Sequence, residues 1–127
     1  MTTAEENKAI VKRFIDALRA GDVATAAACF DPERYYSHAW EGDLAVTWEK
    51  MKATRRAGRY SAWESQTIAY VADGDRVVHH AHHRVTAADT GTTAELDTLE
   101  IWRIDNGLIV EHWGGLREYD RFREQLG

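Results

Sequence analysis

Residues 96–113 read LDTLEIWRIDNGLIVEHW, and this stretch decides the fold because a turn signal separates two strand-like halves. Leu96 to Ile104 alternates apolar and polar residues, and residues 105–107, Asp-Asn-Gly, favour a hairpin turn in which glycine supplies the positive φ. The hairpin puts an acid, Glu100, and an imidazole, His112, on paired strands. The stretch therefore predicts a sheet in which a carboxylate and a histidine lie near each other.

Two registers are open for this hairpin. If all three turn residues form a type I turn with a glycine bulge, Glu100 lies opposite His112. If only Asn106 and Gly107 form the turn, Glu100 lies opposite Trp113. The register decides whether the acid and the imidazole share one face of the sheet.

The second half of the chain repeats the period of two, with turn residues between the alternating segments. We expect strands at Trp63–Ala72, Arg76–Thr86, Leu96–Ile104 and Leu108–Leu116. Consecutive strands joined by short turns form an antiparallel meander.

The first half has helical spacing instead. Thr3 and Glu6 form a capping box, and the apolar residues that follow keep a helical period until Gly21. We expect two further helices, from Asp22 to Phe30 and from Asp43 to near Gly58, a short strand or loop at 35–40, and a closing helix at 119–126. Helices followed by a meander indicate an α+β fold.

Composition limits the possible functions. The 127 residues are 44% hydrophobic, which suits a single domain over 1–127, and the net charge of -5 offers no basic stripe for nucleic acid. There is no apolar run of about 20 residues and no signal-peptide pattern, so we expect a cytoplasmic protein. Motifs for hydrolase triads, nucleotide triphosphates and dinucleotides are missing from the sequence. We expect the lone Cys29 to be a buried core thiol.

Five residues inside one strand, His79-His80-Ala81-His82-His83, are the most unusual polar feature. With a period of two, His79 and His83 share a face with Val77 and Val85, which is the more apolar face. We therefore expect His79 and His83 to point inward, and His80 and His82 to point outward.

The turn between residues 87 and 95 decides what faces Glu100. A turn centred near Gly91 or Thr92 pairs Glu100 with Ala81 or His83, and cross-strand neighbours lie about 5 Å apart. Glu100, His83 and His112 would then converge and could take a proton at one atom and return it at another. The alternatives to a catalytic site are that each histidine is a hydrogen-bonded core residue or a surface residue, and that Glu100 is ion-paired or solvated on its strand.

The outward histidines raise the question of a metal. His80 and His82 have the spacing that lets one strand chelate an ion, but no third ligand is evident on that face. We therefore expect no native metal site and no cofactor.

The outer face of the meander is too apolar for solvent. Leu99, Ile101, Ile109 and Trp113 would face away from the pocket in the bulged register. A second subunit or the C-terminal helix would cover this row, and we favour a homodimer through the outer face.

Three segments together resemble the SnoaL-like branch of the nuclear-transport-factor-2-like superfamily. The resemblance covers nearly the whole chain. They are residues 8–22 (KAIVKRFIDALRAGD), 36–38 (YSH) and 102–113 (WRIDNGLIVEHW). The resemblance implies a cone: a curved antiparallel sheet of about four main strands plus short edge strands, wrapped around three N-terminal helices. It also implies an internal pocket, a dimer through the sheet, and the bulged register with His112 inward.

Members of this superfamily include polyketide cyclases, ketosteroid isomerases and scytalone dehydratase. Glu100 falls where the cyclases and isomerases carry an aspartate, three residues before Arg103. Phe14 falls where the ketosteroid isomerases have an oxyanion-binding tyrosine, and His38 where they have the general-base aspartate. The chain departs from the isomerase pattern at these two positions, while its several histidines are similar in character to the dehydratase.

We therefore expect an acid–base enzyme that acts without a cofactor, as a lyase or isomerase, on a small apolar carbonyl or polyketide-like compound. Glu100 would shuttle the proton, His83 and His112 would polarise or relay, and His38 would lie at the pocket mouth. The predicted substrate-binding wall consists of Phe14, Tyr36, Trp40, Trp48, Met51, Trp63, His79 and Trp102. The alternative is a non-catalytic ligand-binding or dimerisation module.

Overall fold

The computed structural model of the chain describes residues 3–55, 58–115 and 122–127. In chain order its elements are α1 Ala4–Arg19, α2 Val23–Ala28, β1 Tyr36–Ser37, α3 Leu44–Arg55, β2 Tyr60–Asp73, β3 Arg76–Ala87, β4 Thr93–Asp105 and β5 Leu108–Gly114. The sheet has the order β1-β5-β4-β3-β2, in which β1 runs parallel to β5 and all other neighbours are antiparallel.

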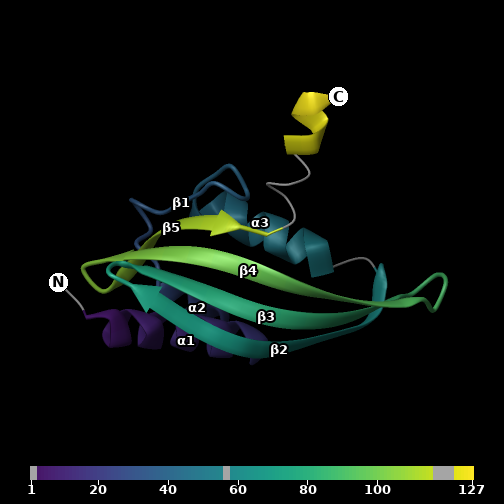
Figure 1. Cartoon of the computed structure of the whole chain (residues 1–127), viewed down its shortest axis with the longest axis horizontal. Helices are drawn as coiled ribbons and strands as arrows, with labels where there is room; N and C mark the ends of the chain where they lie inside the picture. The colour runs from purple at the N-terminus through teal and green to yellow at the C-terminus, as the bar shows by residue number, and fades with distance from the viewer. Residues whose placement is uncertain (1–2, 56–57, 116–121) are drawn as a thin grey trace.

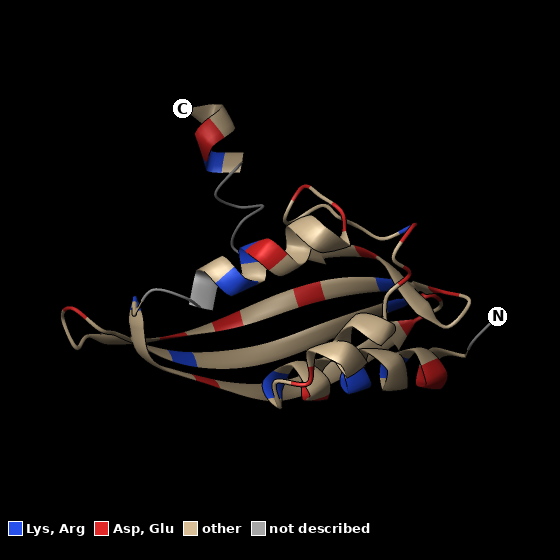
Figure 2. Ribbon diagram, turned by 180° about the vertical axis from the view of Figure 1, so that it is seen from behind, with Lys and Arg blue, Asp and Glu red and all other residues tan. Residues whose placement is uncertain are grey.

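The sheet is long and curved, and α1, α2 and α3 lie on one side of it (Figure 1). The view from behind brings α1 and α3 in front of the strands, with acidic residues on the strand ribbons between them (Figure 2). The expected α+β architecture, a curved sheet wrapped around N-terminal helices, is confirmed.

Helix α1 forms where the sequence predicts it. The Thr3 side chain accepts a hydrogen bond from the backbone N–H of Glu6, and the Glu6 carboxylate accepts one from the backbone N–H of Thr3. This reciprocal capping satisfies two backbone donors that the helix itself leaves unpaired. The chain leaves the helix through Gly21, whose φ of 75° is accessible to glycine at little cost.

An aromatic cluster fills the core between α1 and the sheet. The ring of Phe14 makes edge contacts with Phe30 at 4.8 Å and with Trp102 at 5.1 Å between centroids. Trp48 on α3 packs against Phe14 and Phe30 from the other side. Cys29 is fully buried beside this cluster, as expected for a core thiol.

The β4–β5 hairpin follows neither predicted register. Asn106 and Gly107 alone form the turn, with φ values of 51° and 76°, so Asp105 pairs with Leu108. An unpaired residue, Val110, then shifts the register by one. Both predicted partners of Glu100 are therefore wrong, because Glu100 lies opposite Gly114.

The bulge nevertheless puts His112 on the inner face. One extra residue on one strand reverses the alternation beyond it, so that Glu100 and His112 face the same side. On the turn side of the bulge, the two-residue turn pairs Ile109 with the buried Ile104, and Ile109 lies in the core, where it is 0% exposed. The expectation that Ile109 lies on the outer face is therefore wrong.

The β3–β4 hairpin also differs from its prediction. Thr86 pairs with Thr93, so Glu100 lies opposite His79 and not opposite Ala81 or His83. The difference is an even number of residues, and for that reason the predicted inner face is unchanged.

Two predicted boundaries fall on residues outside the description. Strand β5 ends at Gly114, and its predicted end at Leu116 lies outside the described residues. Residues 119–121 of the predicted closing helix also lie outside them, and residues 122–126 are helical. In the described part of the chain, no helix is long and apolar enough to cross a membrane.

Candidate active site

Two adjoining cavities lie between the helices and the inner face of the sheet, with volumes of about 390 Å³ and about 150 Å³. The larger cavity is lined by Ala39, Trp40, Met51, Tyr60, Trp63, His83, Val85, Leu96, Thr98, Glu100, His112, Gly114 and Gly115. The smaller cavity is lined by Phe14, Ile15, Leu18, Arg19, Trp40, Met51, Ser65, His79, Ala81, His83, Thr98, Glu100, Trp102 and His112. The polar side chains of His83, Thr98, Glu100 and His112 border both.

Glu100 and His112 form the centre of the site. The Nε2 atom of His112 lies 2.5 Å from Oε2 of Glu100. The two residues are diagonal neighbours on the inner face, because Trp102 lies opposite His112 and Gly114 lies opposite Glu100. The His112 side chain is 3% exposed and that of Glu100 is 26% exposed, so the carboxylate reaches the cavity while the imidazole is enclosed.

Ser37 fixes the orientation of the His112 ring. The backbone N–H of Trp40 donates to Oγ of Ser37 at 3.0 Å, and Oγ lies 2.9 Å from Nδ1 of His112. Because an ionised carboxylate only accepts, Nε2 of His112 carries a proton, and in the neutral ring Nδ1 accepts from the Ser37 hydroxyl. Stacking on Trp102, 4.0 Å between ring centroids, holds the ring plane.

Two glycines make room for the carboxylate. A Cβ atom at Gly115 would lie 3.0 Å from Oε1 of Glu100, and one at Gly114 would lie 2.5 Å from the Leu99 carbonyl oxygen. Both have positive φ values, 116° at Gly114 and 78° at Gly115. Oε2 accepts from His112, and the described residues offer no hydrogen bond to Oε1. Within the described part of the chain, that oxygen is left for a bound molecule.

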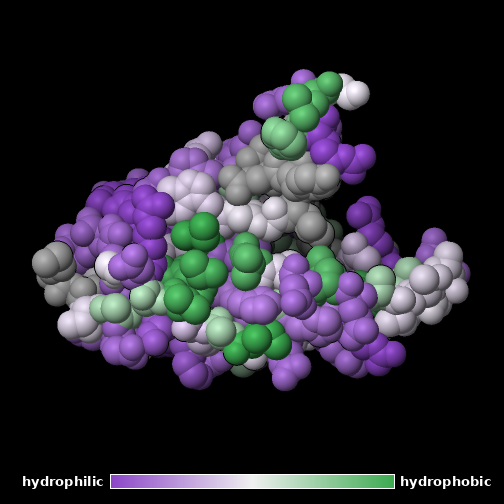
Figure 3. All heavy atoms as spheres, viewed as in Figure 1, coloured by the Kyte–Doolittle hydropathy of each residue, from purple (hydrophilic) through white to green (hydrophobic). Residues whose placement is uncertain are grey.

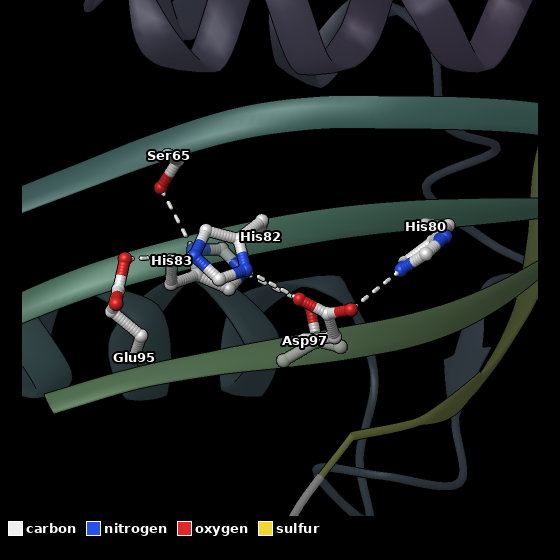
Figure 4. Close-up of polar contacts among 7 residues, drawn as sticks. Ser65, His80, His82, His83, Glu95 and Asp97 are labelled. Atoms are coloured by element: carbon white, nitrogen blue, oxygen red, sulfur yellow. Dashed lines mark hydrogen bonds and ion pairs between the residues drawn. The ribbon is translucent and has the colours of Figure 1, made fainter.

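His83 has a defined tautomer. The indole N–H of Trp63 can only donate, and it lies 3.3 Å from Nδ1 of His83. Oγ of Ser65 lies 2.9 Å from the same nitrogen (Figure 4). Nδ1 therefore accepts, and the ring proton is on Nε2, which donates to Oγ1 of Thr98 at 2.9 Å.

His79 lines the smaller cavity and is held neutral there. Arg19 donates to Oγ1 of Thr67 at 2.9 Å, and the Thr67 hydroxyl lies 2.9 Å from Nε2 of His79. Tyr70 stacks on the imidazole. Burial, followed by the nearby charge of Arg19, lowers the pKa of His79 to about 4.

We expect the pKa of His79 to make the protein less stable in acid. The folded pKa of about 4 lies below the ordinary histidine value of 6.5, so between these pH values the unfolded chain binds the proton and the folded chain does not. Stability is complete above pH 6.5 and falls by up to about 3 kcal/mol as the pH approaches 4. Urea unfolding across this window should show a shallower pH dependence in His79→Gln than in the parent protein.

The matched control is His80→Gln, because His80 is the next residue on the same strand and faces outward. It should keep the steep dependence between pH 4 and 6.5. Parallel profiles for the parent protein and His79→Gln would contradict the proposed effect.

The outward histidines form a separate cluster on the outer face (Figure 4). His82 lies between Asp97 at 2.5 Å and Glu95 at 3.1 Å, and His80 bonds the second oxygen of Asp97. The hydrogen bonds that the His82 ring donates to Asp97, and then to Glu95, raise the pKa of His82. Among the described residues there is no group of three or more His, Cys, Asp or Glu side chains that could hold a metal ion.

The structure brings together most of the residues that the sequence singled out. Glu100, His83 and His112 meet at the border of the two cavities, and His79 lies in the smaller one. Of the predicted wall, the members that line a cavity are Phe14, Trp40, Met51, Trp63 and Trp102.

Three predicted site residues lie elsewhere. His38 lines neither cavity, because it bonds Glu111 at 2.8 Å and stacks on Trp113 beyond the inner face. Tyr36 is 42% exposed and contacts His38. Trp48 belongs to the aromatic core. None of these three side chains lines either of the two cavities.

Sequence reasoning missed several polar residues of the site: Ser37, Ser65, Thr98 and Arg19. Thr98 could have been found, because it lies two residues before Glu100 in an alternating strand and so shares its face. Ser37 could not, since a two-residue strand has no period, and only its parallel pairing with His112 aims it inward.

Comparison with protein families and solved structures gives a consistent result. The family model described as a SnoaL-like domain matches residues 11–112. AclR from Streptomyces galilaeus, a proposed hydroxylase, superposes with a TM-score of 0.71 at 21% identity, covering 89% of this chain and 79% of that one. TerC co-crystallised with polyporic acid gives 0.70 at 18% identity, covering 94% and 96%.

A proposed SnoaL-like polyketide cyclase from Jannaschia Sp. CCS1 gives a TM-score of 0.69 at 15% identity, covering 91% of this chain and 88% of that one. At these identities the superpositions show a shared fold. No curated protein sequence matches the chain.

Proposed function

Because the chain belongs to the SnoaL-like domain family, we propose that it is an acid–base enzyme acting on a small apolar carbonyl compound. The observation that carries the proposal is the Glu100 carboxylate, which is oriented by a buried His112 and presents Oε1 to a cavity with aromatic walls. An apolar pocket with a few converging polar groups is the usual form of a small-molecule site.

The reaction step is a proton transfer at the carbon beside a carbonyl group. Oε1 of Glu100 takes the proton, the electrons of the C–H bond form the C=C bond of an enolate, and the carbonyl π electrons move to oxygen. Glu100 then returns the proton to the same carbon or to another atom. Ring closure, isomerisation and dehydration of carbonyl compounds all begin with this step.

The walls favour a flat, apolar substrate. Trp40, Trp63 and Tyr60 line the larger cavity, whose volume of about 390 Å³ is at the lower end of the range for small-molecule sites. The named structural relatives fit this class, because they include a proposed polyketide cyclase and a protein crystallised with polyporic acid.

The test uses 2-tetralone, a small bicyclic ketone, as a probe for carbonyl compounds. In deuterated buffer the protein should accelerate the exchange of the protons beside the carbonyl group, followed by proton NMR. Quenching of tryptophan fluorescence measures binding independently, since Trp40 and Trp63 line the cavity. A ketone that binds but exchanges only at the rate of the buffer would favour a non-catalytic binding module.

We also propose a homodimer through the outer face of the sheet. An apolar row crosses four strands there, because Val71 pairs with Val78, Val78 with Ile101, and Ile101 with Trp113. Leu99 beside this row is 57% exposed and Val71 is 59% exposed. Figure 3 shows several green, hydrophobic groups among purple, hydrophilic ones on this face of the molecule.

Val71→Glu should weaken this dimer by about 10-fold or more, because a carboxylate would be buried without a partner at the β2 end of the apolar row. Sedimentation should give twice the chain mass of 14.4 kDa for the parent protein and a shift towards the monomer for the variant. Val23→Glu is the control, since Val23 is 57% exposed on the opposite side of the sheet. A parent protein that sediments as a monomer would refute the dimer.

A further inference from the structure

Thr98 is placed to act on the same molecule as Glu100. The two residues are on β4, two positions apart, so their side chains leave the strand on the same face about 6.6 Å apart. Both border the two cavities. A carbonyl group fits between them, with its oxygen towards Thr98 and the neighbouring carbon towards Glu100.

The hydrogen bonds around His83 determine what the Thr98 hydroxyl can offer. Trp63 and Ser65 lie at Nδ1 of His83, so the ring proton is on Nε2 and is donated to Oγ1 of Thr98. Oγ1 thereby accepts from the ring, and the Thr98 hydroxyl proton is left for another acceptor. Among the described residues, His83 is the hydrogen-bond partner of Thr98.

We propose that the Thr98 hydroxyl donates a hydrogen bond to the carbonyl oxygen of the substrate whose proton Glu100 removes, with His83 as a positioning residue behind it. This inference rests on the proposed function. As the C–H bond breaks, negative charge develops on that oxygen, and a donor already aimed at it stabilises the transition state. Donation from His83 to Oγ1 makes the Thr98 proton a better donor through the chain of hydrogen bonds.

The site thus separates two tasks. The carboxylate of Glu100 accepts the proton from carbon, and a neutral hydroxyl opposite it binds the oxygen. A carboxylate cannot donate to an enolate oxygen, so the second group is needed for the first to work. The recognised chemistry is a ketone or a phenol-type oxygen on an apolar body.

The experiment compares Thr98→Val, Thr98→Ser and Thr93→Val in exchange of 2-tetralone. Thr98→Val should lower kcat by about 10–100-fold with a much smaller change in KM, because the bond strengthens as charge develops. Thr98→Ser keeps the hydroxyl and should stay close to the parent protein. Thr93→Val is the matched control, since Thr93 is exposed on the same strand.

His83→Phe tests the positioning role. If the imidazole acts through Thr98, this substitution lowers kcat in the parent protein but has little further effect when combined with Thr98→Val. If His83 had a purely structural role, His83→Phe would lower kcat by the same factor in the parent protein and in Thr98→Val. That result would overturn the relay from His83 to Thr98.

A binding measurement separates failure of this inference from failure of the proposed function. The affinity for 2-tetralone relative to tetralin, a hydrocarbon of similar shape without the oxygen, should fall by about 2–10-fold in Thr98→Val. If the parent protein exchanges the ketone and Thr98→Val does so equally well, Thr98 is not the donor while the role of Glu100 stands. If the parent protein shows no exchange, an unchanged affinity ratio overturns the inference and a reduced one supports it.

Discussion

Glu100→Gln is expected to lower the exchange of 2-tetralone by about 10²–10⁴-fold, the usual contribution of a positioned acid–base group. The amide cannot take a proton from carbon, but its oxygen can still accept the hydrogen bond from Nε2 of His112. The shape of the site and the hydrogen bond to the ring are therefore kept while the base is lost. The measurement is the exchange rate under saturating ketone, with binding followed by tryptophan fluorescence.

The control is Glu64→Gln, which changes the same functional group at an exposed position of β2 opposite Arg84. It should leave exchange unchanged. Equal rates for Glu100→Gln and the parent protein, with the ketone bound by both, would show that Glu100 is not the base.

Phe14→Ala is expected to have the largest effect on stability. The Phe14 ring is 1% exposed and contacts the rings of Phe30, Trp48 and Trp102. Its removal loses buried apolar area and leaves a cavity at the centre of the aromatic cluster, which typically costs about 3–5 kcal/mol. Chemical denaturation should show this loss as a lower midpoint.

The same change at Phe122 is the matched control, because that side chain is 56% exposed. Phe122→Ala should alter the free energy of unfolding by less than about 0.5 kcal/mol. A loss below about 1 kcal/mol for Phe14→Ala would mean that the cluster does not hold α1 against the sheet. Since Phe14 also lines the smaller cavity, ligand binding is compared only under conditions where the variant is folded.

The sequence alone determined the elements and the faces of the strands. Capping at Thr3, the helical period after it and the period of two from Trp63 onwards correctly predicted α1 and the four long strands. The inward direction of His79, His83 and Glu100 was also predictable, because alternation depends on an even or odd count and not on the pairing partner. That of His112 was not predictable from alternation, because the two registers left open for its hairpin put it on opposite faces.

Only the tertiary structure decided which of these side chains meet. The two-residue turn and the bulge at Val110 put Gly114 opposite Glu100, and the glycines there leave space for its carboxylate. The parallel pairing of β1 with β5 turned Ser37 towards His112, and His38 instead forms a hydrogen bond with Glu111. Such contacts depend on the position of single unpaired residues and on strands distant in sequence, whereas local periodicity records only which face of an element is buried.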